Sequence, residues 1–106
     1  MNRLEPHVHS FDPSEWQFDC PIETTVITTR FVLDRSRPIL LVTHDNDGDW
    51  QVLCGTTNEA VDGRVICLGC AYDLDRSISA LFDLPPGWRA WRDHSRADWR
   101  REQNEG

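Results

Sequence analysis

The shortness of its apolar runs is what most limits the fold of this 106-residue chain. The runs span four to ten residues, and the longest is rich in β-branched side chains. The runs are TTVITTRFVL (24–33), ILLV (39–42), WQVL (50–53) and RVICL (64–68). Short β-branched runs between turn-forming residues are typical of strands, whereas an amphipathic helix needs a longer stretch with a period of 3.6 residues. The sequence therefore predicts a sheet of short strands.

The segment between the second and third runs predicts a hairpin. It reads HDNDGD over residues 44–49, and Asp-Gly between two apolar runs is a strong local turn signal. The second run is apolar on both faces, as expected for a strand in the interior of a sheet. In the third run, alternation sends Trp50 and Val52 to the face opposite Gln51.

One helix is expected after these strands, over residues 75–83. Asp75 is a good N-cap, and the residues behind it recur at the three-four spacing of an apolar helix face. The residues that share this face are Leu74, Ile78, Leu81 and Phe82. Pro85 disfavours helical backbone at the residue before it, so the helix should end near Asp83.

Two further strands are predicted after the turn at residues 85–87. In the first, at 88–92, alternation places Arg89 and Trp91 on one face. The chain then returns as a short strand at 98–100.

These elements predict one α+β domain over residues 24–102, with a mainly antiparallel sheet of about five or six strands and one short helix on a face. Residues 1–23 are polar and contain Pro6, Pro13 and Pro21, so we expect an irregular N-terminal arm. The aromatic residues that would anchor this arm on the domain are Phe11, Trp16 and Phe18. Residues 103–106 are expected to form a frayed C-terminus.

The charge balance limits the partners. The chain has 18 Asp and Glu against 11 basic residues, all of them Arg, for a net charge of −7. Such a chain is poorly suited to binding nucleic acid through its phosphates, and it suits a protein with a basic partner or none. Residues 1–10 lack the apolar run of a signal peptide, and no segment approaches the roughly 18 apolar residues of a membrane span. We expect a cytoplasmic protein that does not bind membranes and whose acidic body is poorly suited to nucleic acid.

The four cysteines leave three interpretations open. In a reducing cytoplasm thiols are more often buried small side chains or metal ligands than disulfides. Cys67 and Cys70 have the C-x-x-C spacing with which two thiolates can chelate zinc, but a structural site needs two further ligands. The residues that could supply them are Cys54, Cys20 and His44. Cys67 lies inside a predicted strand, which favours packing over a metal site or a redox-active pair at a helix N-terminus.

The acidic turn DNDGD (45–49) resembles part of a calcium loop. With Gly48 at the sixth position, Thr43 and Cys54 would fall at the first and twelfth positions, where such a loop needs carboxylates. We therefore interpret the segment as a solvated turn that can also serve as an acidic contact surface.

No group of residues indicates catalysis. His7 and His9 lie in the predicted arm, and nothing downstream completes a metal site with them; His44 and His94 are isolated. There is neither a Gly-x-Ser-x-Gly elbow nor a glycine-rich phosphate loop. We expect no catalytic residues, no cofactor and no enzyme.

The C-terminal stretch WRAWRDHSRADWRR (88–101) concentrates Trp and Arg. Residues 1–87 carry 6 Arg and 14 acidic residues, a net charge of −8, whereas residues 88–106 carry 5 Arg and 4 acidic residues, a net charge of +1. Packing of the indoles on the sheet is the favoured interpretation. A protein interface and a single-stranded nucleic-acid site remain as alternatives, because Trp and Arg serve both.

Several segments together resemble a known group of proteins. They are VITTR (26–30), PIL (38–40) followed by HD (44–45), DG (47–48) followed by WQ (50–51), Asp75 with SI (77–78), and LPPGW (84–88) with Ala90 and Arg92. This pattern, which covers residues 20–102, is similar to that of small bacterial proteins of unknown function classed with the immunity proteins of polymorphic toxin systems. The cysteines and the two N-terminal histidines lie outside it. The resemblance implies a binding protein and brings no catalytic residues.

We therefore expect a non-enzymatic protein that neutralises a cognate toxin by direct binding through an acidic surface. A basic active-site groove, as nucleases present, would be the complementary surface. The expected contact residues are Asp45, Asp47, Asp49, Arg89 and Trp91. The alternative is a small zinc-binding or regulatory domain that uses Cys67 and Cys70.

Overall fold

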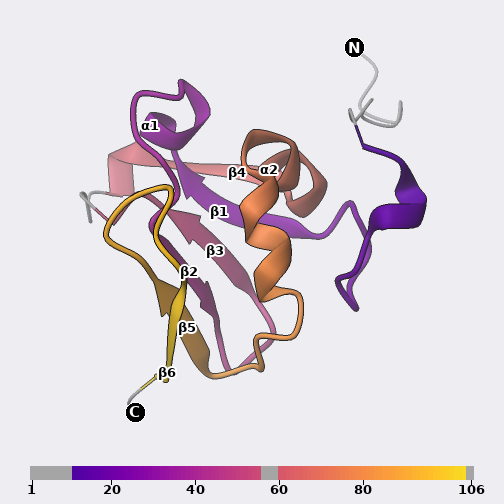
Figure 1. The fold of residues 1–106 in the computed structure, drawn as a ribbon. Coiled ribbons are helices and arrows are strands. Elements are labelled where there is room, and N and C mark those ends of the chain that lie inside the picture. The colour runs from indigo at the N-terminus through magenta and orange to yellow at the C-terminus, as the bar shows by residue number, and fades with distance from the viewer. Residues whose placement is uncertain (1–10, 56–59, 105–106) are drawn as a thin grey trace.

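The computed structural model describes residues 11–55 and 60–104, which form a sheet and several short helices (Figure 1). The strands are β1 (Thr25–Thr29), β2 (Leu41–His44), β3 (Trp50–Leu53), β4 (Gly63–Cys67), β5 (Trp88–Trp91) and β6 (Arg100–Gln103). The helices are α1 (Arg30–Leu33) and α2 (Leu68–Leu74), with the 3-10 helices η1 (Pro13–Glu15), η2 (Ala60–Asp62) and η3 (Arg76–Leu81). Within these ranges no helix is long and apolar enough to cross a bilayer.

The six strands form one sheet in the order β4-β1-β3-β2-β5-β6. β1 pairs in parallel with β3, and the other neighbouring strands pair antiparallel. The predicted α+β class with a mainly antiparallel sheet is confirmed.

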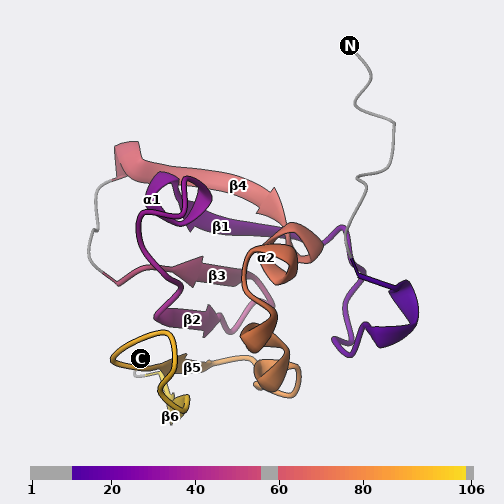
Figure 2. The same ribbon diagram turned by 45° about the horizontal axis from the view of Figure 1, so that its top comes forward.

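Helix α2 and η3 lie across one face of this sheet and close the core (Figures 1 and 2). The strands supply Val26, Val42, Val52 and Ala90, each at most 2% exposed, and these residues pack in one cluster with Ile78 of η3. Apolar alternation on the strands thus meets Ile78 and Leu81 of the apolar face predicted for residues 75–83, whereas Phe82, expected on the same face, is 43% exposed.

The N-terminal segment packs on the same core through aromatic side chains. Phe11 and Phe18 are buried and Trp16 is half-buried, as expected for the anchors of the arm. The Phe11 ring stacks on Trp16 at 5.7 Å between centroids and meets Tyr72 of α2 edge-on at 4.7 Å. Residues 1–10, with His7 and His9, lie outside the described residues.

The predicted hairpin between β2 and β3 is confirmed. The Asp45 N–H donates to the Asp49 carbonyl at 2.8 Å, and the Gly48 N–H donates to the Asp45 carbonyl at 2.9 Å. Gly48 has a φ of +94°, which side chains rarely adopt and which explains why glycine occupies the turn.

The run 24–33 was expected to be one strand, and this prediction is wrong in its second half. The strand ends at Thr29, where the Thr29 hydroxyl caps helix α1 by accepting from the Val32 N–H at 3.4 Å. Threonine is both a good strand former and a good N-cap, so composition alone does not locate the change. Val32 of this helical turn is buried and packs in the core.

Two strand positions are shifted from those predicted. β2 begins at Leu41 rather than at Ile39, whose carbonyl accepts from the Arg92 side chain. The last strand is β6 rather than 98–100, so Gln103, placed by the sequence in a frayed end, pairs with Trp88. The Asn104 N–H also donates to the Gly87 carbonyl at 2.6 Å.

The helix predicted over residues 75–83 is the shorter 3-10 helix η3, and a second helix, α2, precedes it. Asp75 caps η3 as expected, with its carboxylate accepting from the Ser77 N–H at 2.9 Å, but it also ends α2. The sequence predicts a strand over residues 64–68 and no helix before Asp75, so it misses α2. The strand ends at Cys67, whose sulfur caps α2, and cysteine is not a usual capping residue.

Candidate functional site

The face of the sheet opposite α2 and η3 carries a row of side chains, one from each strand. Across the sheet the row consists of Val65, Ile27, Gln51, Thr43, Arg89 and Glu102. Neighbours in the row are register partners, so their side chains project to the same side. Val65 is 68% exposed and Ile27 is 45% exposed, so this side of the sheet is not part of the core.

A second, apolar row lies beside the first. Leu41 pairs with Leu53 on β3 and with Trp91 on β5, and the three side chains are half-buried. Trp91 is two positions from Arg89, so alternation places both on this side of β5. The two rows together form the open face.

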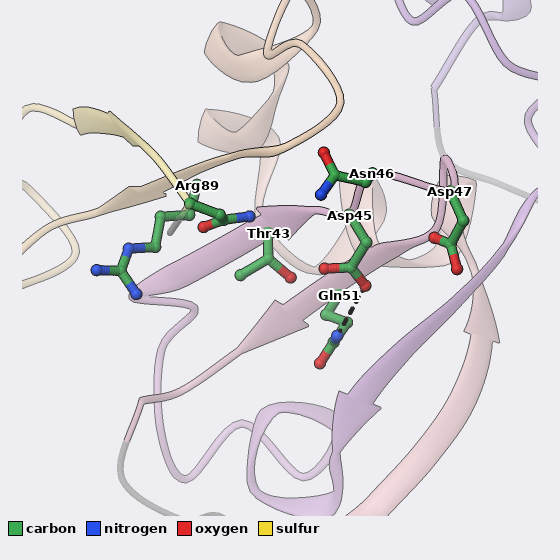
Figure 3. A pocket seen from close by; sticks show the side chains of 7 residues that line it. Thr43, Asp45, Asn46, Asp47, Gln51 and Arg89 are labelled. Atoms are coloured by element: carbon green, nitrogen blue, oxygen red, sulfur yellow. Dashed lines mark hydrogen bonds between the residues drawn. The ribbon is translucent and has the colours of Figure 1, made fainter. Parts of the chain in front are cut away.

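One end of the open face is hollowed into a cavity of about 730 Å³ (Figure 3). Its lining residues are Thr43, Asp45, Asn46, Asp47, Gln51, Arg89 and Asn104. They come from β2, β3, β5, the hairpin turn and the end of the described chain. Figure 3 shows Thr43 between Arg89 on one side and Asp45 on the other.

Hydrogen bonds within the protein fix only some of the side chains that line this cavity. Gln51 Nε2 donates to Asp45 Oδ2 at 3.1 Å, and the Asp49 N–H donates to Asp47 Oδ1 at 3.2 Å. The Thr43 hydroxyl is buried and has no hydrogen-bond partner among the described residues. Hydrogen bonds within the protein therefore satisfy only part of the polar lining of this cavity.

The structure places four of the five expected contact residues at the cavity or on the open face. Asp45, Asp47 and Arg89 line the same cavity, and Trp91 lies on the same open face. Asp49 is exposed in the turn but does not line the cavity. From composition, the sequence predicted that the acidic turn and the residues of β5 act together. The structure makes the turn and β5 adjacent because β2, which leads into the turn, is the neighbour of β5 in the sheet.

Several other residues of the Trp- and Arg-rich segment make contacts within the fold. Trp88 and Trp99 pack against the core, and the Arg92 guanidinium stacks on the Trp99 ring at 4.1 Å. Arg89 pairs with Glu102, and Arg101 pairs with Asp83 at 2.7 Å. Packing, the interpretation favoured from sequence, accounts for these indoles, while Trp91 remains on the open face.

The cysteines and His44 assemble no metal site in the described part of the chain, where no group of three or more His, Cys, Asp or Glu side chains could hold an ion. His44 stacks on Trp50 at 3.9 Å between ring centroids, and its Nδ1 donates to the Leu84 carbonyl at 2.7 Å. Cys54 is buried with its sulfur 3.6 Å from the Thr29 hydroxyl, and Cys20 is half-buried. Two of the ligands that a zinc site would need beside Cys67 and Cys70, His44 and Cys54, therefore make other contacts.

Sequence reasoning missed several polar residues of the cavity: Thr43, Asn46, Gln51 and Asn104. For Gln51 a signal existed, since alternation placed it on the face opposite Trp50 and Val52. For Asn104 none existed, because only the pairing of β6 with β5 brings the chain end to the hairpin.

Comparisons with known proteins add no family to this geometry. No family model, no curated protein and no solved structure matches the chain. The functional argument therefore depends on the open face and its cavity.

Proposed function

We propose that this chain is a non-enzymatic binding protein that neutralises a protein toxin by direct contact through the open face. One observation carries the proposal. Asp45 and Asp47 line one cavity with Arg89, which is far from them in the sequence, and the half-buried Trp91 lies on the same face. The resemblance of the sequence pattern to immunity proteins supports the same function.

The acidic turn carries negative charge that the fold does not neutralise. In the ion pairs formed by described residues, Asp45, Asp47 and Asp49 have no cationic partner. Asp45 accepts instead from the neutral Gln51 amide. Exposed carboxylates of this kind attract a positively charged partner and accelerate its association.

The apolar row beside the cavity supplies the other part of an interface. Energetically important contacts are enriched in Trp and Arg and lie next to apolar surface that excludes water. Trp91 and Leu41 provide the apolar surface, and Arg89 lies between them and the acidic turn. A toxin with a basic groove, such as the phosphate-binding groove of a nuclease, fits this combination.

The test is binding to, and protection from, the product of a neighbouring toxin gene. The wild-type chain should co-purify with that product and prevent its toxicity, with an association rate that falls as salt is added. The double variant Asp45→Asn with Asp47→Asn keeps the shape of both side chains and should weaken binding roughly tenfold or more.

Asp98→Asn is the matched control. Asp98 is an exposed acid that lines a hollow next to η3, on the helix-covered side, and its loss should leave binding unchanged. Full affinity of the double variant, or no binding of the neighbouring product by the wild-type chain, would contradict the proposal.

A further inference from the structure

Cys67 and Cys70 form a close thiol pair where β4 meets α2. Their sulfur atoms are 3.0 Å apart, with the Cys67 thiol donating to the Cys70 sulfur. A disulfide bond is about 2.05 Å long, so the two sulfurs need to approach by only about 1 Å to bond. The proposed toxin-binding function does not use this pair.

The local fold holds the two sulfurs together. Cys67 is the last residue of β4, with extended backbone, and its sulfur accepts from the Cys70 N–H at 3.2 Å as the N-cap of α2. Two backbone bonds from the same turn fix its position: the Leu68 N–H donates to the Thr24 carbonyl at 2.7 Å and the Gly69 N–H to the Ile22 carbonyl at 2.9 Å. The proximity of the sulfurs therefore follows from the strand-to-helix turn.

The two thiols differ in access. Cys67 is 6% exposed, whereas Cys70 is half-buried and reaches the surface. A reagent from solution would meet Cys70 first, and Cys67 would then lie behind it within bonding reach. This is the arrangement of an attacking thiol and a resolving thiol.

We infer that Cys67 and Cys70 are a reversible dithiol–disulfide site that closes by exchange with a low-molecular-weight disulfide such as oxidised glutathione. The Cys70 sulfur, having lost its proton, attacks one sulfur of the reagent, and the reagent's S–S bond breaks to release one thiol. The Cys67 sulfur, also deprotonated, then attacks the Cys70 sulfur of the mixed disulfide and releases the second thiol. The protein loses two electrons and two protons, and the reagent gains them as two thiols.

Disulfide exchange at Cys70 should be slow at neutral pH. Burial raises the pKa of the Cys70 thiol to about 11, and the contact with Cys67 adds to this shift. The attacking thiolate is therefore scarce near pH 7, and the exchange rate should rise with pH up to about that value.

The experiment uses the full reduced chain, incubated with mixtures of oxidised and reduced glutathione and quenched with an alkylating reagent. Intact mass and peptide mapping should show a disulfide between Cys67 and Cys70, which dithiothreitol reverses. In the variant Cys67→Ser the resolving thiol is gone, so glutathione should remain on Cys70 at a level at least about tenfold above that in the wild type.

The control variant is Cys20→Ser, which removes a half-buried thiol outside the pair and should leave the disulfide between Cys67 and Cys70 unchanged. Circular dichroism checks that each variant folds, and the wild-type mass measurement stands without any variant. The inference is overturned if Cys67 and Cys70 stay reduced, and are therefore alkylated, in all mixtures. It is also overturned if the wild type retains as much glutathione on Cys70 as Cys67→Ser does, or if the purified chain holds stoichiometric zinc on these thiols.

Discussion

Arg89 of β5 and Arg92, the residue after β5, lie on opposite faces of the sheet and make different kinds of contact. The Arg92 side chain is 2% exposed; it donates twice to the Ile39 carbonyl and pairs with Asp75 at 2.7 Å. The Arg89 side chain is 45% exposed and pairs with Glu102 at the surface. A buried guanidinium must have its donors satisfied by the protein, whereas an exposed one is satisfied by water and remains available to a partner.

The same contrast extends to the two faces of the sheet. The helix-covered face carries the core and should determine stability. The open face carries exposed apolar and charged residues, and it should contribute little to folding and much to recognition. Four experiments test this division.

The largest loss of stability is expected for Arg92→Ala. It removes the cationic partner of Asp75, the donor to the Ile39 carbonyl and the stack on Trp99, so the free energy of unfolding should fall by about 3–5 kcal/mol. Urea unfolding followed by circular dichroism measures it. Arg92→Lys should recover only part of the loss, because an ammonium group cannot reproduce the planar fork of donors. A loss below about 1 kcal/mol for Arg92→Ala would show that the buried contacts are not structural.

The next largest difference is expected between Ile78→Ala and Ile27→Ala, which remove the same atoms from opposite faces. Ile78 is fully buried, so its truncation should cost roughly 3 kcal/mol through lost burial and the cavity left behind. Ile27 lies on the open face, and its truncation should cost less than about 0.5 kcal/mol. Equal losses in urea unfolding would mean that something covers the open face in solution.

Arg89→Ala should change stability by less than about 1 kcal/mol, because it breaks a surface ion pair. It should nevertheless weaken binding of a toxin partner, since Arg89 lines the cavity. Urea unfolding and a binding titration on the same preparation separate the two effects. A large stability loss with unchanged binding would reverse the roles assigned to the two arginines.

The smallest effect is expected from Asp83, an exposed acid paired with Arg101 of β6. The hydrogen bond from Arg101 lowers the pKa of Asp83 below its usual 3.8. Because the folded pKa is the lower one, the stabilisation is present above the unfolded pKa and is lost as the pH falls through the folded value. Urea midpoints of the wild type and Asp83→Asn should therefore differ slightly at pH 6 and converge below about pH 3. A gap that persists at low pH would contradict this electrostatic origin.

The regions that the sequence predicted well are those in which pattern and local chemistry agree. The hairpin at residues 45–49 follows from Asp-Gly between apolar runs, and the cap at Asp75 follows from its side chain and the apolar spacing behind it. The same pattern assigned Arg89 and Trp91 to one face of β5. Each depends on residues close in sequence, for which propensity and periodicity are informative.

The regions that it missed depend on ambiguous caps or on distant contacts. Thr29 ends β1 and caps α1, and Cys67 ends β4 and caps α2; each side chain accepts from an N–H three residues further along the chain. Threonine also suits a strand and cysteine is not a usual cap, so the local pattern does not locate either boundary. Asn104 joins the cavity because β6 pairs with β5, which no local pattern indicates.

The sequence by itself determined the α+β class, the short strands, the acidic turn and the faces of β5. These follow from side-chain alternation, turn-forming residues and charge, which are local properties of the chain. The strand order, the burial of Arg92, the open face and the approach of the Cys67 and Cys70 sulfurs were decided only by the tertiary structure. They depend on which surfaces the folded chain withdraws from water, and desolvation is a property of the whole assembly of elements and not of any one segment.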